Sequence, residues 1–303
     1  MTVTDTVVMV EPTFFSYNRQ TAINNAFQKQ ISGIDIQAEA IKEFHRMVDK
    51  IRAHDLNVIQ LPSPKANTPD AVFPNNWFST HVIDREPYLF IYPMFSQNRR
   101  DEVQVDALQT ALYRHTGKNY HIVDFREKAK GKALEGTGVF IFDRIERTAF
   151  LSLSPRADLA LAEKVTRKLG YALIYFNSND QNNQPIYHTN VIMSIGQKLA
   201  FICSETISSK KQSAMIRQKL IDAGKKIIDL TYGQICQMAA NVLELQNRKG
   251  ESLLLLSEMA NQALTDAQKS LIDRCCQRVP FAIPTIETVG GGSVRCMLAE
   301  VFY

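Results

Sequence analysis

The sequence of 303 residues lacks the features that mark several functional classes. No apolar run approaches the roughly 18 residues of a membrane-spanning helix, and the start, MTVTDTVVMV, has neither a basic region nor an apolar core. We therefore expect no transmembrane helix and no signal peptide. The 35 Lys and Arg exceed the 31 Asp and Glu by only four, without runs of like charge. Such a weak excess argues against a nucleic-acid or membrane partner.

Motifs for metals and cofactors are also missing, so we expect neither. The sequence has no CxxC, HxH or HExxH, and the adjacent Cys275 and Cys276, on a predicted helix, cannot easily direct both sulfurs at one tetrahedral ion. The glycine cluster Gly290–Gly292 leads into an apolar run, not into the helix that a phosphate loop needs. An odd count of five cysteines without a secretory signal predicts reduced thiols in a cytoplasmic protein.

Secondary-structure patterns repeat five times along the chain. Each round combines an amphipathic helix, a short apolar strand, a strand that opens with a polar residue, and one further strand. The predicted helices cover residues 36–55, 101–117, 157–170, 210–224 and 265–278. The fifth round lacks a strand, which residues 6–12, TVVMVEP, can supply from the other end of the chain.

A ring of five such units would leave no open edge, with the helices outside and the apolar strands between helices and centre. A doubly wound α/β sheet is the alternative. The polar stretch NSNDQNNQP, residues 177–185, is the best candidate for a flexible surface loop or a lid.

One column of the repeat carries the chemistry. The residues that open the third segment of each round are Asp70, Glu135, His188, Asn241 and Cys296, at spacings of 65, 53, 53 and 55. Equivalent positions in a ring converge on its axis, so these side chains would meet at one mouth. Core packing does not demand two acids, a histidine and a thiol there, and we therefore predict an active site.

The residue types suggest a division of labour. The Cys296 thiolate would be the nucleophile, exposed to substrate beside the glycines. His188 would protonate a leaving amine and then take a proton from water, while Glu135 would fix its tautomer and favour its cationic form. Asp70 would accept N–H donors of a substrate head group. Each residue also has a plain structural reading, as a buried cysteine, a satisfied histidine or a turn acid.

At this point the motifs resemble the guanidine-modifying (pentein) superfamily, which includes arginine deiminases, dimethylarginine dimethylaminohydrolases and amidinotransferases. GGGSVRCM resembles its nucleophile motif, LEGTGVFIF its acidic strand and HTN its histidine motif. MAAN, ending at Asn241, is similar to the non-catalytic fourth repeat of the dimethylarginine hydrolases. The resemblance covers nearly the whole chain and implies one catalytic domain, residues 1–303, with a five-fold pseudosymmetric α/β propeller (pentein fold).

The resemblance places the nucleophile, the acid/base, its partner and the head-group ligand on the same four residues, and it adds two arginines. Arg99, in RRDEV, and Arg156, in SLSPRAD, resemble arginines that hold a substrate α-carboxylate through bidentate hydrogen bonds. Solvated arginines at helix starts are the alternative for both.

Departures from the family pattern bear on the substrate. Asn75 and Asn76 stand where dimethylarginine hydrolases have an acidic pair, Asn190 replaces the Asp of the deiminase histidine motif, and Gly138 replaces another acid. A buried carboxylate suits a guanidinium, whereas an amide can both donate and accept. These changes favour a neutral ureido group and a citrulline-type substrate, as in the citrulline-utilisation hydrolase-type branch.

We therefore expect a hydrolase that cleaves a C–N bond of a ureido or guanidino group through a covalent intermediate on the cysteine, without cofactor. An arginine or methylarginine deiminase-type hydrolase and an amidinotransferase share the same residues and remain alternatives. A non-catalytic binding member of the fold is a third. The expected partner is a small amino-acid substrate, and a homodimer is compatible with this reading.

Overall fold

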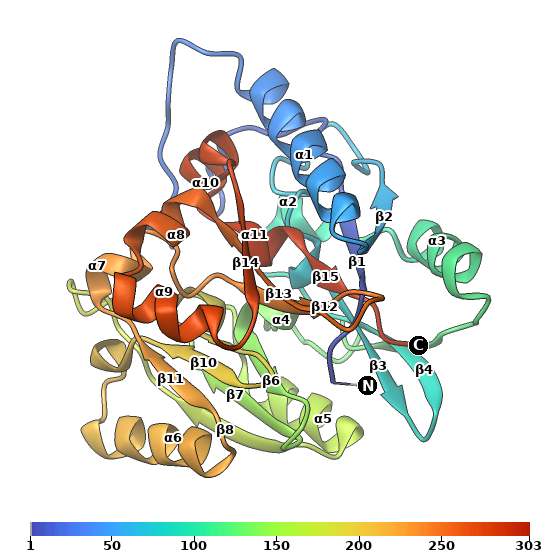
Figure 1. Ribbon diagram of the computed structural model, residues 1–303. Coiled ribbons are helices and arrows are strands. Elements are labelled where there is room, and N and C mark those ends of the chain that lie inside the picture. The colour runs from blue at the N-terminus through green and yellow to red at the C-terminus, as the bar shows by residue number, and fades with distance from the viewer. Residues whose placement is uncertain (1) are drawn as a thin grey trace.

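Five three-stranded sheets make up the protein, with helices around their outside (Figure 1). The computed structural model describes residues 2–303. The strands are β1 (Thr6–Val10), β2 (Asn57–Leu61), β3 (Phe78–Ile83), β4 (Glu86–Ile91), β5 (His121–Asp124), β6 (Phe140–Asp143), β7 (Thr148–Ser152), β8 (Ala172–Phe176), β9 (Met193–Ile195), β10 (Leu199–Ile202), β11 (Lys226–Asp229), β12 (Leu243–Gln246), β13 (Ser252–Ser257), β14 (Gln277–Phe281) and β15 (Ala299–Glu300).

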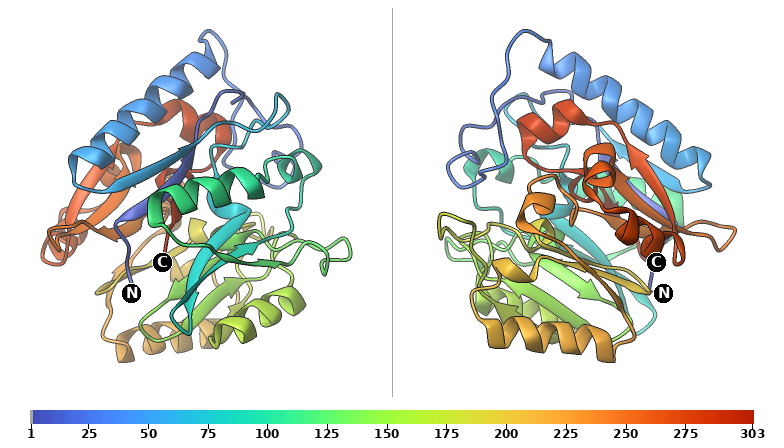
Figure 2. Two further views of the ribbon diagram at one scale, coloured as in Figure 1. Left: turned by 90° about the vertical axis from the view of Figure 1, so that its right-hand side faces the viewer. Right: turned by 60° about the vertical axis from the view of Figure 1, so that its left-hand side comes forward.

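The long helices lie on the periphery (Figure 2). The α-helices are α1 (Ile36–Ala53), α2 (Gln97–Arg100), α3 (Val105–Thr116), α4 (Gly136–Val139), α5 (Leu159–Leu169), α6 (Lys210–Asp222), α7 (Tyr232–Ile235), α8 (Glu258–Ala263), α9 (Asp266–Asp273), α10 (Pro284–Gly290) and α11 (Val294–Met297). The 3-10 helices are η1 (Pro74–Asn76), η2 (Thr189–Val191) and η3 (Ser204–Thr206).

All five sheets share one topology, which confirms the predicted five-fold repeat. The central strands β1, β4, β7, β10 and β13 each have one antiparallel and one parallel neighbour. The parallel neighbour follows in the chain after a crossover that contains α1, α3, α5, α6 or α9. The result is a five-fold pseudosymmetric α/β propeller with mixed sheets, the pentein fold.

The two ends of the chain close the ring, as the missing strand predicted. Strand β1 pairs with β15 in the register Val7 to Glu300 and Val8 to Ala299. The hydroxyl of Thr4 donates to the carbonyl of Val301 at 2.6 Å, adding a buried hydrogen bond to the closure. The pairing gives β1 a second neighbour and completes the fifth three-stranded sheet.

The long helices lie where their apolar periodicity placed them, and local capping sets their ends. Asp35 accepts a hydrogen bond from the backbone N–H of Ala38, which starts α1. Gly117 and Gly170 end α3 and α5 with φ of 69° and 66°. The helix predicted for residues 265–278 stops at Asp273, so Cys275 and Cys276 lie beyond it in a turn.

The segments predicted to begin strands begin instead with short helical turns. The turns η1, α4, η2 and α11 precede β3, β6, β9 and β15. The glycine cluster predicted to lead straight into an apolar strand also lies between helices, because α10 ends at Gly290 and α11 follows. Turns of three or four residues are too short to show the period that separates a helix from a strand, which is why the sequence pattern missed them.

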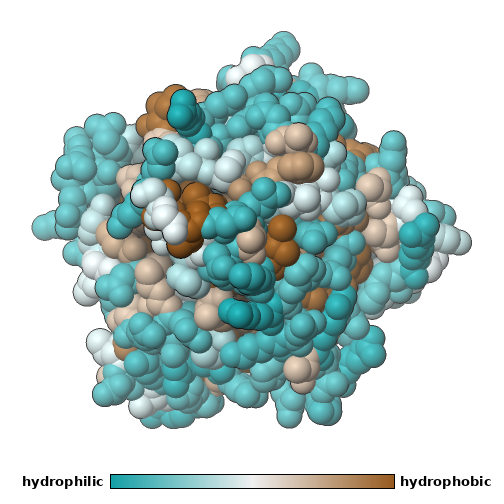
Figure 3. All heavy atoms as spheres, turned by 90° about the horizontal axis from the view of Figure 1, so that it is seen from above, coloured by the Kyte–Doolittle hydropathy of each residue, from teal (hydrophilic) through white to brown (hydrophobic). Residues whose placement is uncertain are grey.

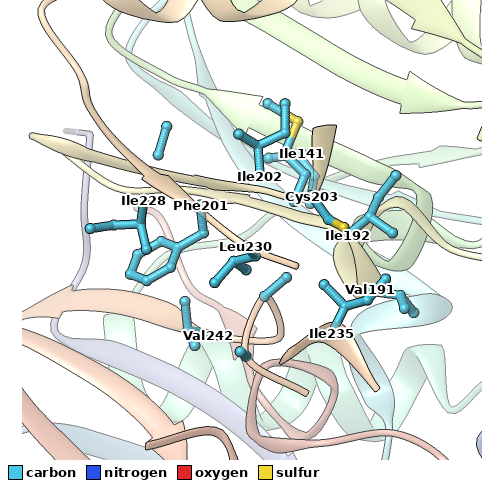
Figure 4. Close-up of a cluster of buried hydrophobic side chains, with 14 of the residues drawn as sticks. Ile141, Val191, Ile192, Phe201, Ile202, Cys203, Ile228, Leu230, Ile235 and Val242 are labelled. Atoms are coloured by element: carbon cyan, nitrogen blue, oxygen red, sulfur yellow. The ribbon is translucent and has the colours of Figure 1, made fainter. Parts of the chain in front are cut away.

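The hydrophobic core divides into four clusters between sheets and helices. Figure 4 shows part of one of them, where Phe201, Ile228 and Leu230 gather beside β10 and β11. Cys203 belongs to this cluster, and its burial raises the pKa of its thiol to about 12. From above, the surface is mostly hydrophilic with small separate hydrophobic groups (Figure 3). Within residues 2–303, no helix is both long and apolar enough to cross a membrane.

Candidate active site

The predicted column of polar residues meets at the centre of the ring. The turns η1, α4, η2 and α11 pack against one another there. Asp70, Glu135, His188, Asn241 and Cys296 are all buried, with at most 6% of any of them exposed. The ring therefore brings together groups from five distant parts of the sequence, as the spacing predicted.

His188 and Glu135 form a direct pair at 2.7 Å between Nε2 and Oε2. The other carboxylate oxygen of Glu135 accepts the backbone N–H of Phe95 at 3.0 Å, and Arg156 approaches Oε2 at 3.4 Å. Burial alone would raise the pKa of Glu135, but Arg156 and His188 hold it far below its ordinary value. Since a carboxylate only accepts, Nε2 of His188 carries the hydrogen and Nδ1 is left as the acceptor.

The protonation of His188 differs from the prediction. Burial lowers its pKa from 6.5 to about 4, although Glu135 acts in the opposite direction. We predicted that Glu135 would favour the cationic imidazole, and the direction of its influence was correct. Desolvation is the larger effect because the ring is 3% exposed, so the resting imidazole is neutral near pH 7.

The Cys296 sulfur is held by two amides. Asn241 donates from Nδ2 to Sγ at 3.2 Å, and Asn190 donates from Nδ2 at 3.5 Å. The neighbouring Arg295 turns away and binds the carbonyl of Leu298 and the Glu300 carboxylate. Among residues 2–303, no Lys, Arg or His donates a hydrogen bond to this sulfur.

Unpaired polar atoms mark where a ligand can bind. Within the described chain, buried atoms without a hydrogen-bond partner include the acceptors Oδ1 of Asp70, Oδ1 of Asn75 and Oδ1 of Asn190. The unpaired donors include Nδ2 of Asn75, Nδ2 of Asn76 and Nε of Arg156. An unsatisfied buried polar group costs about 1–3 kcal/mol, so this concentration indicates a site that a polar ligand completes.

Asp70 is tied to the N-terminal part of the chain by its other oxygen. Its Oδ2 accepts Nδ2 of Asn18 at 2.7 Å and the Thr21 hydroxyl at 2.9 Å. Burial raises the pKa of Asp70, while Arg99 opposes that effect. Oδ1 remains available to a substrate N–H, as expected for a head-group ligand.

The two predicted arginines are buried, so neither is the solvated helix-start residue of the alternative reading. Arg99 binds Glu102 through Nε and Nη2, holds Oδ1 of Asn76 at 2.6 Å, and reaches the carbonyl of Phe73 at 3.0 Å. Its donors are thus committed to the segment around η1, and this geometry does not support the predicted bidentate grip on a substrate carboxylate.

Arg156 keeps more freedom than Arg99. It contacts Glu135, the carbonyl of Thr21 at 3.3 Å and the side chain of Asn24, and its guanidinium lies 4.7 Å from the centre of the Tyr187 ring. Its Nε has no partner. Of the two arginines, Arg156 is therefore the one placed to meet a ligand.

The sequence analysis missed the segment that covers the site, residues 18–28. Besides Asn18 and Thr21 on Asp70, this segment contributes Asn24 to Arg156 and Asn25 to the carbonyl of Gly291 at 3.4 Å. Long connections without regular structure are commonly functional, so the length of the stretch between β1 and α1 was the available signal.

The loop predicted as a lid, residues 177–185, is a loop without helix or strand, but it lies farther out. Together with the segment 18–28 it borders a cavity of about 450 Å³ whose wall includes Phe27, Gln184 and Tyr187. Whether it moves as a lid stays a prediction.

Gly138 provides the space next to the histidine. A Cβ at this position would lie 2.4 Å from Nδ2 of Asn76 and 2.9 Å from Nδ1 of His188. Both distances are far inside van der Waals contact, so no side chain fits at residue 138 without moving the site. In the described part of the chain, no group of His, Cys, Asp and Glu is arranged to hold a metal ion.

Comparisons with known proteins agree with this geometry. The family model described as "N,N dimethylarginine dimethylhydrolase, eukaryotic" matches residues 11–303. No curated protein sequence gives a significant match.

Solved structures share the fold at low sequence identity. The N-terminal domain of ArgZ, an arginine dihydrolase from cyanobacteria solved with its substrate, is 12% identical with a TM-score of 0.73, and the match covers 98% of this chain and 97% of that domain. A mutant DDAH from Pseudomonas aeruginosa in complex with citrulline is 13% identical with a TM-score of 0.66, covering 99% and 100%. Unliganded AgrE is 16% identical with a TM-score of 0.74, covering 98% of this chain but only 39% of AgrE.

Proposed function

The chain belongs to the N,N dimethylarginine dimethylhydrolase family, and from that membership we propose a cysteine hydrolase that cleaves a C–N bond of a ureido or guanidino group in an arginine-related amino acid. Residues 1–303 would act as one catalytic domain. The supporting observation is a buried cluster around η2. His188, directly before η2, pairs with Glu135 at 2.7 Å, and Asn190 in η2 donates a hydrogen bond to the Cys296 sulfur. All five cysteines are unpaired, which suits a reducing compartment such as the cytoplasm.

The chemistry proceeds in two balanced steps. First, the Cys296 sulfur bonds to the central carbon of the head group, the thiol proton passes to Nδ1 of His188, and His188 delivers it to the departing amine. A neutral resting imidazole suits this role because it can accept the thiol proton. Second, water attacks the covalent intermediate, gives its proton to His188, and the C–S bond breaks to restore the thiol. On a ureido group the intermediate is a thiocarbamate, and the carbamate released from it loses CO2.

The substrate we favour is of the citrulline type. Unpaired amide atoms of Asn75, Asn76 and Asn190 offer both donors and acceptors around the head group. A ureido group presents a carbonyl and N–H groups, so it can satisfy both kinds. The solved complex of the Pseudomonas DDAH mutant contains citrulline, so a site on this fold can bind a ureido head group.

An arginine-type substrate is the second candidate, and one observation favours it. Oδ1 of Asp70 is a buried carboxylate oxygen without a partner, and a guanidinium N–H is its strongest match. ArgZ is an arginine dihydrolase, in line with this reading.

The test is a substrate panel with product detection. Citrulline, arginine, methylated arginines and agmatine are incubated with the protein while ammonia, methylamines, ornithine and CO2 are measured. We expect turnover of citrulline that Cys296→Ala abolishes and that Cys236→Ala, which removes an exposed thiol, leaves intact. Mass spectrometry after rapid acid quench should find the adduct on the peptide that contains Cys296. Retained activity in Cys296→Ala would overturn the mechanism.

A further inference from the structure

The environment of the Cys296 sulfur poses a chemical problem. The residue is 6% exposed, and the sulfur receives no hydrogen bond from a cationic side chain in the described chain. A buried thiolate without compensation is costly, because burial disfavours the charged form. The attacking sulfur nevertheless has to carry negative charge when it meets the substrate. The neutral donors that contact the sulfur are therefore placed to supply part of that stabilisation.

Asn241 is the nearest of these donors, and its orientation is determined by its neighbours. Its Nδ2 lies 3.2 Å from the backbone carbonyl of Asn190 and 3.2 Å from the sulfur. A carbonyl can only accept, so the group facing it must be the NH2. That NH2 points a second N–H at Sγ, while Oδ1 at 3.5 Å can accept the S–H of the neutral thiol.

We propose that Asn241, the fourth-repeat residue that the family resemblance marks as non-catalytic, stabilises the Cys296 thiolate. Its Oδ1 accepts a hydrogen bond from the S–H of the resting thiol, and its Nδ2 donates to the sulfur once negative charge develops. Asn190 is the second donor, and its unpaired Oδ1 remains for the substrate. This inference rests on the proposed function, because it concerns the nucleophile of that reaction.

Other ionisable groups near the sulfur do not stabilise its negative charge in the resting state. Arg295 is paired with Glu300 at 3.1 Å, and its pKa is lowered by burial. Tyr187 is a neutral phenol whose pKa is raised by burial, and its hydroxyl binds the carbonyl of Gly291. His188 is paired with Glu135 and is neutral near pH 7.

The test follows the alkylation of Cys296 by iodoacetamide across pH in the full-length protein, with the site of labelling read by peptide mapping. For each variant, the alkylation rate at each pH is divided by the plateau rate of that variant at high pH. Differences in the access of iodoacetamide to the sulfur then cancel. Asn241→Leu keeps the branched shape of the side chain and removes its donor and its acceptor, and Asn241→Asp places a second negative charge beside the sulfur. A hydrogen bond to a charged group contributes about 1.5–3 kcal/mol. We therefore expect the midpoint of the Leu variant to rise by about one to two pH units, and that of the Asp variant by more.

Turnover separates this role from a merely structural one. Because Asn241 touches the sulfur and backbone only, Asn241→Leu should lower kcat by about 10- to 100-fold with KM little changed. Asn119→Leu, at an exposed asparagine between α3 and β5, is the matched control. Unchanged midpoints in both Asn241 variants would overturn the inference while leaving the hydrolase intact. A shifted midpoint in a protein that hydrolyses none of the substrates would overturn the proposed function instead.

A second measurement does not depend on the Asn241 variants folding. In the wild-type protein, the side-chain N–H resonances of Asn241 should shift with pH at the alkylation midpoint. The shift should vanish in Cys296→Ser, which lacks the thiol. Resonances that stay constant through that midpoint would refute the proposal.

Discussion

The phenol of Tyr187 donates a hydrogen bond of 2.9 Å to the carbonyl of Gly291, which ties the residue before His188 to the turn before Cys296. The two residues are 104 positions apart in the chain. The bond therefore helps to set the position of the third repeat, which contains His188, relative to the fifth, which contains Cys296.

Tyr187→Phe tests this connection. The ring remains to stack on Arg156, and only the hydroxyl is lost. A buried hydrogen bond contributes about 1 kcal/mol, so we expect a comparable loss of unfolding free energy and a fall of about fivefold in kcat. Urea denaturation and steady-state kinetics measure the two. Tyr113→Phe, at an exposed tyrosine, should change neither.

Glu135→Gln should remove most of the activity. The two carboxylate oxygens of Glu135 accept hydrogen bonds from the Phe95 N–H and from Nε2–H of His188. A glutamine amide has only one oxygen, so it cannot accept both. Residue 135 would no longer fix the His188 tautomer that carries its hydrogen on Nε2, and the expected drop in kcat is about 10³-fold or more. Exposed Glu146→Gln is the control. Activity within tenfold of wild type would show that Glu135 does not orient the histidine.

The acid limb of the pH profile of kcat/KM should lie at an unusually low pH. His188 accepts a proton only when neutral, and its pKa of about 4 keeps it neutral well below pH 6. We expect kcat/KM to hold its neutral value down to about pH 5 and to fall below that as His188 becomes protonated. A limb with its midpoint near 6.5, the ordinary histidine value, would contradict the burial argument.

Gly138→Ala should damage the site by steric means alone. The new methyl group would meet Asn76 at 2.4 Å and His188 at 2.8 Å. Kinetics should show a loss of kcat/KM of about 100-fold, since misplacement by about an ångström has that effect. Gly233→Ala is a matched control, because its nearest neighbour would be 3.8 Å away. Equal activities in the two variants would mean that the space beside His188 is not needed.

Glu287→Gln should alter how stability depends on pH. Glu287, which accepts the Ser293 hydroxyl, has a pKa raised by burial from 4.5 to about 7. Its folded form binds a proton more tightly than the unfolded chain, so unfolding free energy falls as pH rises from about 4.5 to 7. The total loss is on the order of 3 kcal/mol. Glu287→Gln should flatten this slope in denaturation at several pH values, whereas exposed Glu127→Gln should retain it.

Much of the fold followed from local pattern. Apolar periodicity located the long helices, and the strand left over at residues 6–12 predicted closure with the C-terminus, which β1 and β15 confirm. We predicted strand starts at the short turns η1, α4, η2 and α11, because three or four residues are too few to show a helical period.

The site was partly accessible to the same reasoning. The spacing of Glu135, His188 and Cys296 placed them in equivalent repeats, and the pairing of Glu135 with His188 followed from chemistry. The partner of Arg99 could not be inferred, since Glu102 lies three residues away on the same turn and claims the guanidinium only once both are buried.

The sequence by itself determined the order of the repeats, the residue types at their equivalent positions and hence the chemistry that could gather there. Only the tertiary structure decided that His188 rests neutral, that the segment 18–28 covers Asp70, and that two amides donate to the Cys296 sulfur. Those features depend on burial and on contacts between distant segments, and local pattern contains neither.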